Sequence, residues 1–192
     1  MNKKYLKMSK MIREDIINNL NEAEYGSLKY LFDIDNQSFV IQAGKRFEEW
    51  FYTIIEDHIV EDGGQMLPSG VIPNLVKKGQ KKDVDMLYDD GQGTVYYREL
   101  KSNIELDSEK LRVTADKVKE ITKVLKKKYP KKNIDAGVFC WGVYDIEDNL
   151  KKINGKINLF DKNNVKVEFP KELFGRLGFN CNKKDYIKYF RG

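Results

Sequence analysis

Apolar side chains recur with a helical period most clearly over residues 40–60. They are spaced three and four residues apart, which places them on one face of a helix. The residues that share this face are Phe47, Trp50, Phe51, Ile54, Ile55 and His58. A second amphipathic pattern covers residues 108–129, where apolar residues lie along one face with lysines opposite, and Pro130 ends it. We therefore expect two long helices, at about 40–60 and 108–129.

Between these helices, residues 81–104 show the pattern of a β-hairpin. Runs rich in Val, Leu and Tyr flank the sequence Asp-Asp-Gly-Gln-Gly at 89–93, and aspartate and glycine suit hairpin turns. A further strand is expected over residues 136–146, and residues 65–80, with two prolines and two glycines, predict a loop with a short strand.

The two ends of the chain carry weaker patterns. Residues 5–32 predict two helical pieces separated at Gly26 and Ser27. The sequences KINLFD and VKVEF near the C-terminus predict short strands, followed by one or two closing helices. The order helix, hairpin, helix, strand predicts an α/β (α+β) fold with a central mixed sheet flanked by helices. We expect one domain over residues 1–192, with a core at about 40–146 and helical N-terminal and C-terminal additions.

Composition fits a globular protein and adds a bias toward nucleic acid. The 192 residues are 41% hydrophobic and 12% aromatic, charged residues reach 34%, and the formal net charge is +5. A basic balance weakly favours a nucleic-acid partner. The N-terminal segment lacks the apolar core of a signal peptide, and no apolar stretch is long enough to span a bilayer, so we expect a soluble, cytoplasmic protein.

The scarcity of histidine and cysteine excludes several classes of site. His58 is the single histidine, so histidine-rich metal sites are excluded, and its place on an apolar helix face predicts a structural role. Cys140 and Cys181 are too far apart for a disulfide framework or a zinc motif, and Cys140 is expected in the core.

The segment with candidate chemistry is the hairpin, where Asp83 and Asp85 precede the turn and Glu99 and Lys101 follow it. Side chains alternate along a strand, so Glu99 and Lys101 share one face. A turn centred near Gly91 predicts that Asp83 lies opposite Glu99 and that Asp85 lies opposite Tyr97. Either aspartate could then share a cation with Glu99. Mg²⁺ is typically bound by one or two carboxylates together with waters and a substrate phosphate.

We choose Asp85 as the first carboxylate and keep Asp83 as the alternative. Val84 and Met86 flank Asp85 and anchor it within the strand, whereas Asp83 follows two lysines at the start of the strand. The plain alternative is an exposed hairpin whose charges form cross-strand salt bridges.

This pattern resembles the PD-(D/E)XK nuclease superfamily, and most of all its type II restriction endonucleases. The match is Asp85 followed by Glu99-Leu100-Lys101, with Val84 in place of the family's proline. The resemblance implies a restriction-endonuclease-like core over residues 40–146 and cleavage of double-stranded DNA with Mg²⁺. It implies that Asp85, Glu99 and the Leu100 carbonyl bind the metal and that Lys101 positions or activates the attacking water. A palindromic target would require a homodimer.

Several members of the family also use a glutamate on the helix before the hairpin, for which Glu48 and Glu49 are candidates. Glu48 falls at the edge of the apolar face, roughly 70° from its centre, whereas Glu49 falls on the far side in solvent. Glu48 is therefore the better candidate, and a solvated boundary residue is the equal alternative.

Lysines near the hairpin and on the second long helix could contact DNA phosphates, which would make binding strongly dependent on salt. They are Lys77, Lys78, Lys81, Lys82, Lys117, Lys119, Lys123, Lys126, Lys127, Lys128, Lys131 and Lys132. For each one alone, a solvated surface is the simpler interpretation. Residues 65–74 are candidates for contacts with DNA bases, and this suggestion rests only on their position just before the hairpin. The alternatives to a restriction enzyme are a repair or junction-resolving nuclease of the same fold and a non-enzymatic basic DNA-binding domain.

Overall fold

In the computed structural model, residues 1–18, 37–73, 81–102, 104 and 108–191 are described. The helices are α1 (Lys3–Asn18), α3 (Gln37–Ile59), α4 (Ser108–Lys128), α5 (Leu150–Lys162), α6 (Pro170–Arg176) and α7 (Lys183–Arg191), with 3-10 turns η1 (Val60–Asp62) and η2 (Ile146–Asn149). The strands are β1 (Gln65–Met66), β2 (Gly70–Pro73), β3 (Lys81–Val84), β4 (Met86–Asp89), β5 (Thr94–Lys101), β6 (Asn133–Cys140) and β7 (Lys166–Glu168).

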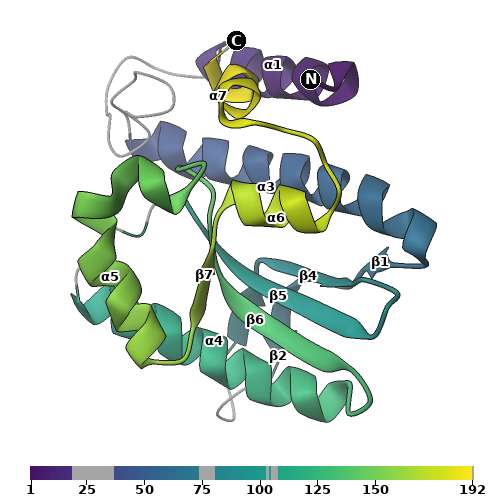
Figure 1. Ribbon diagram of the computed structural model, residues 1–192, viewed down its shortest axis with the longest axis vertical. Helices are drawn as coiled ribbons and strands as arrows, with labels where there is room; N and C mark the ends of the chain where they lie inside the picture. Colours follow the sequence, from purple (N-terminus) through teal and green to yellow (C-terminus); the bar gives the residue numbers. More distant parts are fainter. Residues whose placement is uncertain (19–36, 74–80, 103, 105–107, 192) are drawn as a thin grey trace.

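A five-stranded mixed sheet with the order β1-β4-β5-β6-β7 forms the centre of the molecule (Figure 1). The pairs β1–β4 and β4–β5 are antiparallel, whereas β5–β6 and β6–β7 are parallel. The parallel step from β5 to β6 needs a long crossover, which α4 provides. The predicted mixed sheet flanked by helices is confirmed.

Two hydrophobic cores lie on opposite faces of this sheet. One includes aromatic side chains of α3, α6 and α7 against Met86, Tyr88, Leu100 and Phe139. The other packs α4 and α5 against Leu87, Val95, Tyr97 and Val138. Alternation along β5 explains the division, because residues 95 and 97 point to the α4 side while residue 100 points to the α3 side.

The chain ends meet on the outer side of α3. Helices α1 and α7 lie side by side there (Figure 1), and the Asn2 amide donates a hydrogen bond of 2.9 Å to the Tyr189 hydroxyl. His58 packs on this side with its ring 5.1 Å from Phe179, and its Nδ1 lies 2.7 Å from the Ile54 carbonyl oxygen. These contacts agree with a structural role for His58, and Cys140 is buried as expected.

The predicted hairpin forms, but its register differs from the expectation. Asp89 pairs with Val95 and Met86 with Arg98, so the turn is centred at Gln92 rather than Gly91. The Asp90 carboxylate accepts hydrogen bonds from the amides of Gln92 and Thr94. Glycines 91 and 93 both have positive φ, of 75° and 107°, a conformation that favours glycine.

Two further expectations are wrong. The first half of the predicted hairpin strand, β3, leaves the main sheet and pairs antiparallel with β2. The sequence KINLFD lies in α5 rather than in a strand, because Phe160 is buried against α4 as part of a helix. The second N-terminal helical piece and lysines 77 and 78 lie outside the described residues. Among the described helices, none is both long and apolar enough to cross a membrane.

Candidate active site

Glu99 and Lys101 lie at the C-terminal end of β5, on the face of the sheet that α4 covers. The Glu99 side chain is buried, with 5% of its surface exposed, while the Lys101 side chain is 29% exposed. Lys101 Nζ donates a hydrogen bond of 2.8 Å to Glu99 Oε1. As the alternation of the strand predicts, the two side chains share one face.

Asp85 is the single residue between β3 and β4, at the point where the chain changes its strand partner from β2 to β5. Its Oδ2 accepts a hydrogen bond of 2.9 Å from the Leu100 amide. The carboxylate thus takes the place of the backbone carbonyl that would accept this bond in a regular sheet. This bond holds the carboxylate against β5, next to Glu99. The N–H and C=O of a residue in an extended strand leave the same edge, so the Leu100 carbonyl is directed to the edge where Asp85 lies.

Asp83 has a different place. It lies on β3 opposite Val71 of β2, and its side chain is exposed. The expectation that Asp83 lies opposite Glu99 is wrong, because the wider turn shifts the pairing by two positions. The structure brings Asp85, and not the alternative Asp83, into contact with the end of β5.

Lys117 of α4 also belongs to this site. Its Nζ lies 2.5 Å from Glu99 Oε2 and 3.7 Å from Asp85 Oδ1, so it contacts both carboxylates. Sequence reasoning placed Lys117 among the lysines of a solvated helix face. Its position three residues after the buried Thr114 and one before the buried Val118 was the available signal. Asp85, Glu99, Lys101 and Lys117 are together called the Glu99 cluster.

The two carboxylates of the Glu99 cluster differ in their acidity. Burial raises the pKa of Asp85 to about 6, and repulsion from Glu99 adds to the rise, against the attraction of Lys117. Burial also opposes the charged form of Glu99, but the ion pairs with Lys101 and Lys117 outweigh it and hold its pKa below the ordinary value. A pair of carboxylates whose pKa values are driven apart is typical of functional sites.

Tyr52 of α3, one helical turn after Glu48, packs with the core on the other face of the sheet and lies near enough to Asp85 to be affected by its charge. Burial raises the pKa of Tyr52, a hydrogen bond with Ser69 opposes the rise, and the charges of Glu48 and Asp85 add to it. Tyr52 therefore lies close enough to Glu48 and Asp85 for their negative charges to affect its pKa. Glu48 is partly buried and Glu49 is exposed, as the helical pattern predicts.

The donor set of the Glu99 cluster fits Mg²⁺ and does not fit zinc. It offers two carboxylates and a backbone carbonyl, and Mg²⁺ takes one or two carboxylates while waters and phosphate complete its shell. Within the described part of the chain, no group of three or more His, Cys, Asp or Glu side chains could hold a metal ion. A metal held by this cluster would therefore depend on the substrate for part of its coordination.

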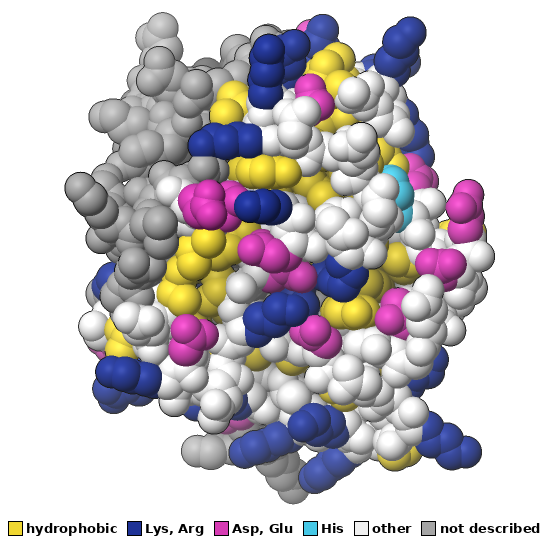
Figure 2. All heavy atoms as spheres, viewed as in Figure 1, with side chains coloured by type: hydrophobic (Ala, Val, Ile, Leu, Met, Phe, Trp, Pro, Cys, Tyr) yellow, Lys and Arg dark blue, Asp and Glu magenta, His cyan; other side chains and the backbone are white. Residues whose placement is uncertain are grey.

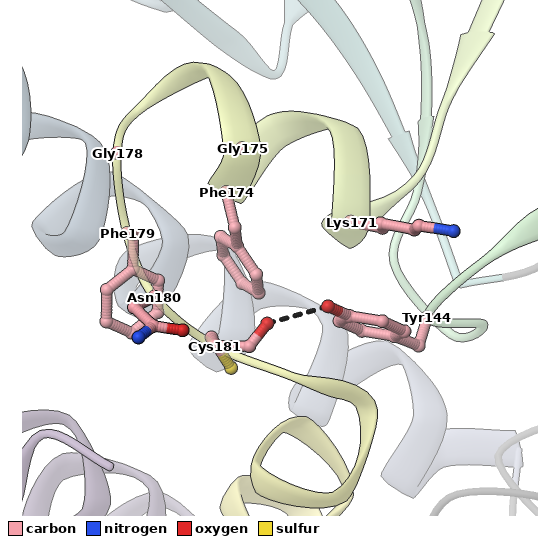
Figure 3. A pocket seen from close by; sticks show the side chains of 8 residues that line it. All are labelled: Tyr144, Lys171, Phe174, Gly175, Gly178, Phe179, Asn180 and Cys181. Carbon is pink, nitrogen blue, oxygen red and sulfur yellow. Dashed lines mark hydrogen bonds between the residues drawn. The ribbon is translucent and has the colours of Figure 1, made fainter.

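A separate hollow of about 310 Å³ lies beside α6 (Figure 3). The Tyr144 hydroxyl on its wall donates a hydrogen bond of 2.6 Å to the Cys181 carbonyl, and the Lys171 ammonium pairs with Asp145. Burial raises the pKa of the Cys181 thiol to about 12, so this thiol is not a nucleophile at neutral pH. The hollow contains none of the residues of the Glu99 cluster, and its Tyr144 and Lys171 side chains are engaged within the protein.

Comparison with known proteins gives no matching family model, no matching curated protein and no matching solved structure.

Proposed function

We propose that this protein is a Mg²⁺-dependent endonuclease that cleaves double-stranded DNA, most like a type II restriction endonuclease. The observation that carries the proposal is the convergence of Asp85, Glu99 and Lys101 at the end of β5, through hydrogen bonds of 2.8 and 2.9 Å. The order α3, β1, β4, β5, α4, β6 of the elements in and around the five-stranded sheet supports it, because the PD-(D/E)XK core that the sequence resembles has the order αβββαβ.

In this proposal each residue has a defined role. Asp85 and Glu99 hold the metal, with the Leu100 carbonyl as a further ligand. When bound there, Mg²⁺ supplies positive charge to the scissile phosphate. Lys101 reaches the same space on a side chain that is partly exposed, so it can hold the attacking water or stabilise charge on the phosphate.

The placement of the lysines supports DNA as the substrate. Lys123, Lys126, Lys127 and Lys128 are exposed on α4, the helix that also supplies Lys117. By contrast, acidic and basic side chains are interspersed over the sheet and α6 on the face drawn in Figure 2. We expect duplex DNA to approach along α4, with an affinity that falls steeply as salt rises. Cleavage of a palindromic site would require a homodimer.

The test is incubation of the purified protein with supercoiled plasmid and Mg²⁺, with and without EDTA, followed by sequencing of the DNA ends. We expect cleavage that requires Mg²⁺ and is lost in Glu99→Gln but retained in the exposed control Asp83→Asn. Ends at one fixed sequence support a restriction enzyme, and scattered or structure-dependent ends support a repair or junction-resolving nuclease. If the protein binds DNA in a salt-dependent way but does not cleave it, the proposal of an enzyme fails and a non-enzymatic DNA-binding domain takes its place.

A further inference from the structure

Lys117 lies between the two carboxylates of the Glu99 cluster, where a cation shared by them would lie. Its ammonium faces Glu99 Oε2 at 2.5 Å and Asp85 Oδ1 at 3.7 Å. The other two carboxylate oxygens have different partners, because Lys101 donates to Glu99 Oε1 and the Leu100 amide donates to Asp85 Oδ2. The oxygens that face each other across the cluster are therefore the two that Lys117 contacts.

The cluster is balanced in charge by its own side chains. Two carboxylates face two ammonium groups, so a divalent cation that enters must take the place of an ammonium at one or both oxygens. Lys117 is the ammonium that such a cation would replace, since Lys101 contacts the other oxygen of Glu99. The Tyr97 hydroxyl also donates a hydrogen bond of 3.2 Å to Oε2, but it is neutral. The Lys117 side chain is 19% exposed and has a flexible four-carbon stem, so its ammonium can move outward without a change in the backbone.

We propose that Lys117 is an internal competitor for the divalent cation, and that its ammonium moves from the carboxylates to a DNA phosphate when metal and DNA bind. The inference rests on the proposed function, because it assumes that Asp85 and Glu99 hold a metal. It adds a residue to the site that the sequence pattern of the hairpin does not contain. It also explains how two close carboxylates are kept in a folded protein before the metal arrives: Lys117 offsets their repulsion.

The experiment measures the binding of Mn²⁺ alone, without DNA, to the wild type and to Lys117→Met by titration calorimetry. We expect the variant to bind Mn²⁺ about three- to tenfold more tightly, the effect of removing one competing ion pair from a partly buried site. Lys123→Met is the matched control, since it removes the same charge from an exposed position of the same helix and should leave Mn²⁺ binding unchanged. Lys117→Gln serves in the same comparison where the methionine variant is poorly folded.

A second measurement follows the other half of the proposal. At saturating Mg²⁺, Lys117→Met should cleave plasmid about tenfold more slowly, because the phosphate has lost a positive partner. Half-maximal cleavage should nevertheless need less Mg²⁺ than in the wild type. A residue that only maintains the fold would not lower the metal requirement.

The outcomes separate the two proposals. If the wild type binds Mn²⁺ and Lys117→Met binds it equally or more weakly, Lys117 is not a competitor, and the proposed function stands without it. If neither protein binds Mn²⁺ without DNA but the wild type cleaves plasmid with Mg²⁺, the inference fails and the proposed function stands. If neither protein binds Mn²⁺ and neither cleaves plasmid, the proposed function fails together with the inference.

Discussion

Residues 98 and 99 are neighbours on β5, yet they belong to two charge clusters on opposite faces of the sheet. Arg98 pairs with Glu168 at 2.8 Å and with Asp135 at 2.8 Å, and Arg176 pairs with Glu168 at 2.6 Å. These residues, called the Arg98 cluster, hold two carboxylates and two cations, as the Glu99 cluster does. Each of the two clusters as defined therefore contains two carboxylates and two cations. They differ in whether arginine or lysine supplies the positive charge and in how far their side chains are exposed.

The Arg98 cluster has a closed centre, because the side chains of Arg98 and Glu168 are 0% and 1% exposed. Asp135 and Arg176 lie at its edge and are 27% and 23% exposed. Arg98 also donates to the carbonyls of Tyr97 and Asp135, and the Arg176 guanidinium lies 4.1 Å from the Tyr96 ring centroid. Burial opposes charge on Glu168, but both arginines outweigh it and hold its pKa below the ordinary value. Arginine remains charged and binds through a rigid fork, so this cluster cannot exchange its partners easily.

The Glu99 cluster has no ion pair in which both side chains are fully buried. Its cations are lysines, with side chains 19% and 29% exposed, and the pKa of its Asp85 carboxyl is raised to about 6. A lysine is a point charge on a flexible stem, so it can leave a carboxylate when a ligand arrives. The comparison indicates that a fully buried arginine–carboxylate pair fixes a structural cluster, whereas partly exposed lysines leave a cluster free to exchange partners.

The largest effect that we expect is on stability, in the Arg98 cluster. Glu168→Ala leaves Arg98 buried without its main partner and should lower the free energy of unfolding by about 3–5 kcal/mol. Urea denaturation measures it, with the exposed Glu147→Ala as the control, which should stay within about 0.5 kcal/mol of the wild type. Equal effects of the two substitutions would show that the Arg98 cluster does not hold the fold together.

The next effect is on cleavage, in the Glu99 cluster. Lys101→Met should reduce plasmid cleavage about 10²- to 10³-fold, as expected for the loss of a charged group at the reacting phosphate. Its free energy of unfolding should change by only about 1 kcal/mol, because the ion pair is partly exposed and Glu99 keeps Lys117. A large loss of stability with cleavage intact would reverse the distinction between the two clusters.

A third effect, on the dependence of stability on pH, concerns Asp85. Its pKa is raised from 3.8 to about 6, so the folded state favours the protonated carboxyl. The stability it contributes is present below about pH 4 and is lost as pH rises through about 6. Asp85→Asn should therefore stabilise the protein by about 2 kcal/mol at pH 8 and have little effect at pH 4, while cleavage is lost.

Urea denaturation at pH 4, 6 and 8 measures this effect of Asp85→Asn. Asp83→Asn, on the exposed side chain two residues earlier, should show no such trend. If Asp85→Asn destabilised the protein at pH 8, the ionised Asp85 would be a stabilising ion-pair partner, as the carboxylates of the Arg98 cluster are.

The smallest effect concerns α3, where two adjacent glutamates differ in exposure. Glu48→Ala should slow cleavage about tenfold, since Glu48 is partly buried on the helix that also brings Tyr52 near Asp85. Glu49→Ala should leave cleavage unchanged, because Glu49 faces solvent. Equal rates for the two variants would exclude Glu48 from the site.

The sequence predicted those features that depend on local pattern. The helices at 40–60 and 108–129 were placed to within a few residues, because a face of aromatic and aliphatic side chains has a clear period. The shared face of Glu99 and Lys101 followed from strand alternation alone. The α5 helix was missed, since Asn154 and Gly155 disfavour helix and Ile157 and Leu159 after them alternate with polar residues as in a strand.

The features that were missed depend on distant parts of the chain. The register of the hairpin differs from the predicted one because Asp90, Gly91 and Gly93 form a longer turn than expected. Asp85 turns toward Leu100 because β3 pairs with β2, a partner that the pattern of residues 65–80 did not specify. Lys117 joins the site only because α4 packs across β5, and a helical pattern does not say which lysine will lie above which strand.

The charged side chains of β5 also have a consequence for how this strand finds its partners during folding. A slip of one residue turns every side chain of a strand to the opposite face. In β5 such a slip would move Arg98 into the aliphatic packing against α4 and Glu99 into the aromatic packing against α3, leaving both charges unpaired. Unpaired buried charges are strongly unfavourable, so misaligned forms of the sheet are disfavoured from both faces at once. Glu99, which is proposed for catalysis, and Arg98, which is structural, thus both favour the correct alignment of the central strand.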